Sequence, residues 1–205
     1  MRVQTLKGEA TMVCKGIAGR PVALGAVLAV LMVVSAGCAD QDRLRSVVVV
    51  DSINSNEAIQ SDVFSFGDDL DDPRDDFVPE DEISVIFRNT PIDPAFTPEP
   101  NKPFGDVVIT RYLVEFDVAD ADLAPFGGGM YAKVPTGQTV EAFVTAIPAL
   151  YKMQPPLVQL VGGGGVGEIT GAVNLTFWGE EMQTGDEFTL RASVVCNFAD
   201  FADEN

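Results

Sequence analysis

Residues 168–178 (EITGAVNLTFW) and 187–199 (EFTLRASVVCNFA) alternate between apolar and polar side chains over most of their length. Successive side chains of a β-strand point to opposite faces, so this alternation predicts two strands that each bury one face. The buried face of the first strand would hold Ile169, Val173, Leu175 and Phe177. The buried face of the second would hold Phe188, Leu190, Ala192, Val194, Cys196 and Phe198, which places Cys196 in the core.

The same period recurs along the chain between turns rich in Gly, Pro and Asp. It predicts strands at 46–52, 59–64, 82–89, 106–118, 130–134 and 139–147. The last two flank the turn at 135–137 and are expected to form a hairpin. The alternation in 106–118 places five side chains on one face, namely Val108, Tyr112, Val114, Phe116 and Val118. A short helix is expected at 148–154, because Pro155 and Pro156 would end it.

About seven to nine short strands without a long helix predict an all-β fold. The expected plan is an immunoglobulin-like β-sandwich of antiparallel strands, with a jelly roll or a small barrel as alternatives. The domain is expected to span 46–205, interrupted by an acidic loop at 62–82 and a Pro-rich loop at 90–106.

The N-terminal 37 residues differ from the rest of the chain. They carry four basic side chains and one acidic one, followed by an uncharged run over 21–39. The apolar centre, 22–34 (VALGAVLAVLMVV), is shorter than the roughly 20 residues that span a bilayer core. This profile predicts a signal peptide at 1–37, with an uncleaved anchor helix as the alternative.

The end of this segment, Ser35-Ala36-Gly37-Cys38, resembles the lipobox of bacterial lipoproteins. The resemblance implies cleavage before Cys38, lipidation of Cys38 and attachment to the cell envelope, with the outer membrane expected. Acyl chains supply about 0.8 kcal/mol for each buried methylene, so they anchor a domain without a transmembrane helix. Residues 38–45 would then be a lipidated tether. An ordinary signal peptide without lipidation is a further alternative. If Cys38 were not lipidated, a disulfide from Cys38 to Cys196 would be possible.

The mature region also resembles a group of predicted envelope lipoproteins of unknown function. The similarity lies in 104–112 (FGDVVITRY), in the glycines of 162–165, in the strand that ends at Trp178 and in 197–203 (NFADFAD). It implies an immunoglobulin-like envelope lipoprotein and carries over no catalytic residue.

Charge and composition exclude or disfavour several classes of function. The chain of 205 residues has 31 acidic and 13 basic side chains, a net charge of -18 and no histidine. Nucleic-acid binding is disfavoured, because phosphate contacts need Lys or Arg. Triads that contain histidine and His-ligated zinc sites are impossible. We therefore expect a non-enzymatic structural or binding module with an envelope protein or glycan as partner, and an acid-pair hydrolase is the alternative.

Two features are candidate sites. The acidic loop could supply oxygen ligands to calcium in an adhesion or carbohydrate-binding domain, or it could be a solvated loop. Its candidate ligands are Asp68, Asp69, Asp71, Asp72, Asp75 and Asp76. No other cofactor is expected, because the Gly-x-Gly-x-x-Gly pattern at 162–167 precedes a strand instead of the helix that binds a phosphate.

Trp178 is the second candidate. It lies on the opposite face of its strand from Phe177 and so points away from the core. An exposed aromatic side chain of this kind can stack on a sugar ring or anchor a partner. The alternative is that the loop at 125–129 covers it.

Overall fold

The computed structural model describes residues 44–65, 76–93, 95, 97, 104–119, 121–162 and 167–201. The predicted signal peptide, Cys38 and five of the six candidate calcium ligands, all except Asp76, lie outside these residues. All described residues belong to one compact unit, which spans Val34–Asn205.

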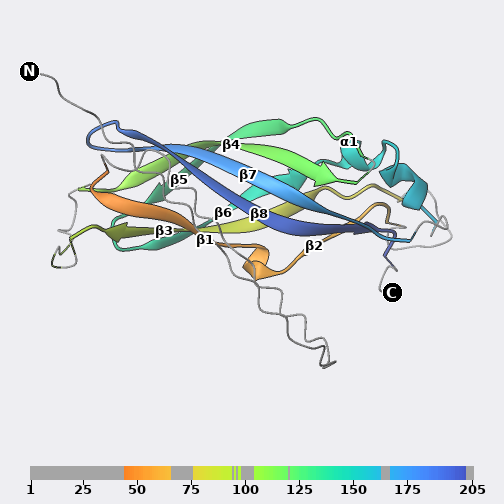
Figure 1. Ribbon diagram of the computed structural model, residues 1–205, viewed down its shortest axis with the longest axis horizontal. Coiled ribbons are helices and arrows are strands. Elements are labelled where there is room, and N and C mark those ends of the chain that lie inside the picture. The colour runs from red at the N-terminus through yellow and green to blue at the C-terminus, as the bar shows by residue number, and fades with distance from the viewer. Residues whose placement is uncertain are drawn as a thin grey trace, which may run out of the picture. The chain divides into compact units, whose positions relative to one another are not determined.

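Two β-sheets form the described part of the chain (Figure 1). The three-stranded sheet has the order β1-β3-β6, with β1 at Ser46–Ile53, β3 at Asp81–Pro91 and β6 at Thr139–Ile147. The five-stranded sheet has the order β2-β8-β7-β4-β5. Its strands are β2 (Ile59–Asp62), β8 (Glu187–Ala199), β7 (Ile169–Glu181), β4 (Val107–Val118) and β5 (Phe126–Val134). The prediction of an all-β sandwich is therefore confirmed.

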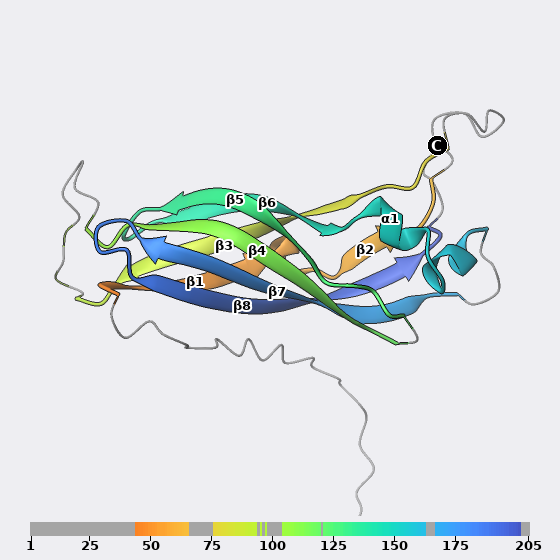
Figure 2. The ribbon, with the colours of Figure 1, turned by 90° about the horizontal axis from the view of Figure 1, so that it is seen from above.

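The short helices lie in the connections. They are η1 (Asn54–Asn56), α1 (Ala149–Lys152) and η2 (Leu157–Leu160). The predicted acidic loop is the β2–β3 connection, and the predicted Pro-rich loop is the β3–β4 connection. Figure 2 shows α1 at the opposite end of the strands from the β7–β8 turn.

The chain passes repeatedly between the two sheets, with β1, β3 and β6 in one and β2, β4, β5, β7 and β8 in the other. Every pair in the described sheets is antiparallel except β2 and β8, which run parallel. The exception arises at η1, where Asn54, Ser55 and Asn56 all have positive φ. This left-handed turn, which Asn adopts more readily than most residues, moves the chain from the three-stranded to the five-stranded sheet.

The core lies between the two sheets and uses the residues that alternation predicted. Val85 and Phe87 of β3 and Val173 and Phe177 of β7 are fully buried. The rings of Phe87 and Phe177 meet edge to face with their centres 5.0 Å apart, which joins the sheets at the middle. Cys196 is also fully buried, as its place in the strand pattern predicted.

The predicted hairpin at 130–147 is wrong, because β5 and β6 belong to different sheets. Asn89 of β3 explains the crossing. Its amide nitrogen donates to Gln138 O (3.0 Å), and its carbonyl oxygen accepts from Gly137 N (2.8 Å). Its side-chain Nδ2 donates to Val134 O (3.0 Å). The turn is thus hydrogen-bonded to β3, and the strand that follows it pairs with β3 instead of with β5.

The predicted inward face of β4 is wrong at Val108, which pairs with the exposed Glu180 on the outer side of the sheet although it is only 6% exposed. The register shifts between Ile109 and Arg111, so Thr110 is an extra residue opposite β7 and both Thr110 and Arg111 are exposed. The core cluster therefore contains Val107 and Ile109, and not Val108. A β-bulge of this kind redirects side chains locally, and here it brings two polar side chains next to each other on the outer face.

Of the predicted tether at 38–45, only Leu44 and Arg45 are described. Leu44 is buried in the core cluster, and Arg45 forms an ion pair with the buried Glu181. Residues 44 and 45 therefore pack against the domain.

Candidate functional site

Trp178 lies on the outer face of the five-stranded sheet and is partly buried. The residues at 125–129 do not cover it, because most of them form the start of the edge strand β5, on the far side of β4. Instead the guanidinium carbon of Arg111 lies 4.6 Å from the centre of the Trp178 ring. The β4 bulge makes this contact possible, since it turns Arg111 outward directly opposite Trp178.

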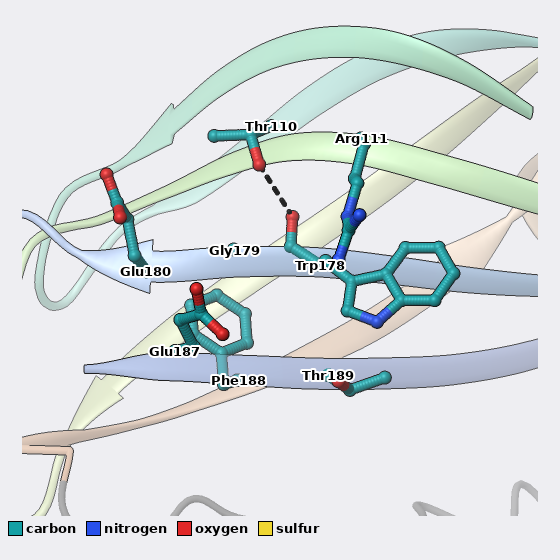
Figure 3. A pocket seen from close by; sticks show the side chains of 8 residues that line it. All are labelled: Thr110, Arg111, Trp178, Gly179, Glu180, Glu187, Phe188 and Thr189. Carbon is teal, nitrogen blue, oxygen red and sulfur yellow. Dashed lines mark hydrogen bonds between the residues drawn. The ribbon is translucent and has the colours of Figure 1, made fainter. Parts of the chain in front are cut away.

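A depression of about 430 Å³ lies beside the indole (Figure 3). It is lined by Thr110, Arg111, Trp178, Gly179, Glu180, Glu187, Phe188 and Thr189. The volume falls in the range of small-molecule sites in proteins. Its lining is mostly polar, and the Thr110 hydroxyl donates to the Trp178 carbonyl oxygen at 3.4 Å.

The position of Gly179 in β7 leaves no room for a side chain. A Cβ added there would lie 2.5 Å from the carbonyl oxygen of Val108 and 2.6 Å from the Phe188 ring. Neither distance is found for a real side chain, so only glycine allows β4, β7 and β8 to approach this closely.

The neighbouring edge strand leaves the outer face open beside Arg111. Gly129 pairs with Arg111, and a Cβ added at Gly129 would meet nothing within 4 Å. Tyr131, the next outward position on β5, is 75% exposed. The indole and the guanidinium are therefore accessible from the side of β5.

Charges of both signs surround the depression. Glu180 and Glu187 are paired directly across β7 and β8, and both are exposed. Like charges in this arrangement repel each other. In the described part of the chain, Glu180, Glu187 and Arg111 do not take part in any ion pair. Their hydrogen-bonding groups are therefore available to a ligand.

Such a site can bind a polyhydroxylated molecule. The indole offers a flat apolar face, while Arg111 donates and the two glutamates accept charge-assisted hydrogen bonds. A glycoside hydrolase would instead place its two carboxyl groups on either side of the scissile bond. Glu180 and Glu187 both lie on the same side of Trp178 (Figure 3).

Five of the six candidate calcium ligands lie outside the described residues. The sixth, Asp76, is half-buried. In the part of the chain that the structure covers, no group of three or more Asp, Glu, Cys or His side chains is placed to hold a metal ion. Calcium binding by the acidic loop therefore stays a prediction.

A buried ionic cluster was missed by the sequence reasoning. Lys152 of α1 is fully buried, and its Nζ lies 2.9 Å and 3.0 Å from the two carboxylate oxygens of Asp81. Nζ also donates to Asp62 O at 2.7 Å, and the Ser61 hydroxyl donates to Asp81 at 2.6 Å. The cluster joins the last residue of β2 to the first residue of β3 and so fixes both stems of the acidic loop. No local pattern in the sequence indicates that Lys152 is buried, because its partner Asp81 lies on a distant strand.

Burial changes the acid–base properties of this region. Desolvation raises the pKa of Asp81 above its ordinary value, although the Ser61 hydrogen bond and Lys152 oppose the shift. Desolvation also raises the pKa of the Cys196 thiol, and the charge of Asp81 adds to that increase. The thiol is therefore held in its unreactive protonated form.

Among the helices of the described residues, none is long and apolar enough to cross a membrane. Comparison of the chain with protein-family models, with curated proteins and with solved structures found no match. The function therefore has to be argued from the site itself.

Proposed function

We propose that this protein is a non-enzymatic lipoprotein of the bacterial cell envelope that binds a saccharide on the outer face of its five-stranded sheet. One observation carries the proposal: the partly buried Trp178, stacked under Arg111, forms part of a polar depression with unpaired hydrogen-bonding groups. The resemblance of residues 35–38 to a lipobox supports attachment to a membrane, with the outer membrane as the expected one.

The chemistry of the depression favours a sugar over other ligand classes. Sites for apolar small molecules are enclosed and lined mainly by hydrophobic groups, whereas this depression is open and polar. Polyanions are disfavoured by the net charge of -18. A sugar ring presents an apolar face to an indole and hydroxyl groups to charged side chains at its edge, which matches this lining.

Binding to a panel of oligosaccharides tests the proposal. The full chain in detergent would be titrated calorimetrically with oligomers of glucose, N-acetylglucosamine, mannose and galactose. At least one should bind, and Trp178→Ala should weaken its affinity by about tenfold or more, which corresponds to about 1.4 kcal/mol. Circular dichroism would confirm that the variant is folded.

Phe143 provides the matched control. It is an aromatic side chain that is 60% exposed, but it lies on β6 of the other sheet. Phe143→Ala should bind the saccharide as the wild type does. Failure of every oligomer to bind, or equal affinities of wild type and Trp178→Ala, would overturn the proposal.

A further inference from the structure

The start of β1 is fixed firmly to one end of the sandwich. Leu44 is 4% exposed, and the Arg45 guanidinium lies 4.7 Å from the centre of the Phe104 ring. Arg45 Nε lies 3.7 Å from Glu181 Oε1, and the Arg45 backbone N–H donates to Glu181 Oε2 at 3.2 Å. Its side chain also donates to Gln183. We call this part of the domain the Arg45 end.

The opposite end carries α1 and the buried Lys152, and we call it the Lys152 end. Strand β7 runs from Ile169, near the Lys152 end, to Glu181 at the Arg45 end. Its thirteen residues span about 40 Å at the usual rise of a strand. The two ends are therefore separated by a distance comparable to the thickness of a membrane.

Few residues separate the expected lipid from the Arg45 end. If Cys38 is lipidated, as the proposed function holds, only 39–43 lie between it and the packed Leu44. A chain of this length reaches at most about 20 Å when fully extended. The Arg45 end must then stay close to the bilayer surface, whereas the Lys152 end can point away from it.

The Arg45 end presents exposed apolar side chains. Ile92 is 58% exposed, Met182 is 44% exposed and Phe104 is 40% exposed. They lie next to Arg45 and its partner Glu181. Ile92 N donates to Arg45 O at 3.3 Å, and Phe104 lies under the Arg45 guanidinium. Met182 directly follows Glu181 in the sequence.

Two carboxylates near these apolar groups are already paired with basic side chains. Glu181 is fully buried against Arg45. Asp106 accepts an ion pair from Lys133 at 3.1 Å, and its backbone oxygen accepts from Met182 N at 2.9 Å. A lipid surface could therefore meet the apolar side chains without stripping water from these two charges.

We propose that the lipid-anchored protein docks its Arg45 end on the bilayer surface, with Ile92, Phe104 and Met182 in the interfacial layer. The inference rests on the proposed lipid anchor. It places the Trp178 depression near the membrane, because Trp178 lies three residues before Glu181 on β7. Because the net charge is -18, docking should not require anionic lipid and should occur on phosphatidylcholine.

Two methionines test the orientation. Met182 at the Arg45 end is 44% exposed, and Met153, which directly follows α1 at the Lys152 end, is 55% exposed. Met182→Cys and Met153→Cys would each be made in the full lipidated chain and labelled with an environment-sensitive fluorophore. Each protein would be reconstituted into phosphatidylcholine vesicles with and without brominated lipid, which quenches fluorophores at the membrane.

Brominated lipid should quench the label at 182 several-fold more than the label at 153. Equal quenching at both positions, or stronger quenching at 153, would overturn the docking proposal. The Cys38→Ser variant separates the two claims. If the wild type co-floats with vesicles and Cys38→Ser does not, the anchor stands whatever the labels show. If the wild type does not co-float, the anchor and the docking proposal both fail.

Discussion

Lys152 Nζ lies 2.9 Å from Asp81 Oδ2, and the lysine side chain is fully buried. This ion pair connects the short helix α1 to the first residue of β3. Burying two charges costs desolvation free energy that their attraction only partly offsets, so the pair is poor evidence of added stability. Its structural effect is to fix the geometry at the base of the acidic loop, because the same ammonium group also donates to Asp62 O.

Removing one partner of this pair should be more harmful than removing both. Lys152→Met leaves Asp81 without its counter-charge and should lower the free energy of unfolding by about 3–5 kcal/mol. The double variant Lys152→Met, Asp81→Leu should recover most of that loss. Urea unfolding followed by circular dichroism measures both.

The exposed pair between Arg88 and Asp51 is the control. Its atoms lie 2.7 Å apart, and the two side chains are 53% and 39% exposed. Arg88→Met should change the free energy of unfolding by no more than about 1 kcal/mol, as is usual for surface pairs. Equal losses in Lys152→Met and Arg88→Met would refute the structural role of Lys152.

Asp81 should give the stability a distinctive pH dependence. Desolvation raises its folded pKa above the ordinary value of 3.8, so the folded state binds this proton more tightly than the unfolded state. Its contribution to stability is then greatest below pH 3.8 and declines as pH rises through the folded pKa. Relative to Asp81→Asn, the wild type should lose stability over that interval and show a constant difference above it. Unfolding of both proteins across the pH series measures this, and parallel curves would contradict it.

Cys196 should be unreactive in the folded protein. It is fully buried, so a reagent cannot reach it. Desolvation also raises the pKa of its thiol, so the reactive thiolate is not formed. A thiol reagent should label it only after unfolding in urea. Val195 is 38% exposed on the other face of β8, so a cysteine introduced by Val195→Cys should react at once in the folded state. Rapid labelling of Cys196 in the native wild type would show that the core is open.

Replacement by alanine should destabilise the domain at one glycine of the five-stranded sheet and have little effect on stability at another. Gly179→Ala would place a Cβ 2.5 Å from a backbone oxygen and should destabilise the domain by about 1–3 kcal/mol. Gly129→Ala would place its Cβ in open space, so its free energy of unfolding should stay within about 0.5 kcal/mol of the wild type. Thermal unfolding of the two variants tests this close approach of the strands beneath the depression, and equal melting temperatures would contradict it.

Local patterns in the sequence were sufficient to predict which segments form strands and most of the side chains that are buried. The alternation around Phe177 and Cys196 correctly identified which side chains are buried, because a strand has a fixed period and one dry face. The same pattern placed Trp178 on the outer face. These features depend only on neighbouring residues in the chain.

Features that depend on distant contacts could not be predicted in this way. The sheet change after Val134 requires hydrogen bonds from Asn89, which is far away in the sequence. The bulge at Thr110 reverses the faces of β4 without interrupting its apolar pattern, so Arg111 was not expected beside Trp178. Lys152 gave no local sign that it would be buried, because its partner lies on another strand.

The most direct test of the saccharide site uses its own tryptophan. Trp178 is the single tryptophan of the chain, so the intrinsic emission reports on this depression alone. Titration of the full chain with the oligosaccharide that binds in calorimetry should give a saturable change in emission, with the same dissociation constant by both methods. If calorimetry detects binding while the emission of Trp178 stays unchanged, the ligand binds elsewhere and the proposed site is wrong.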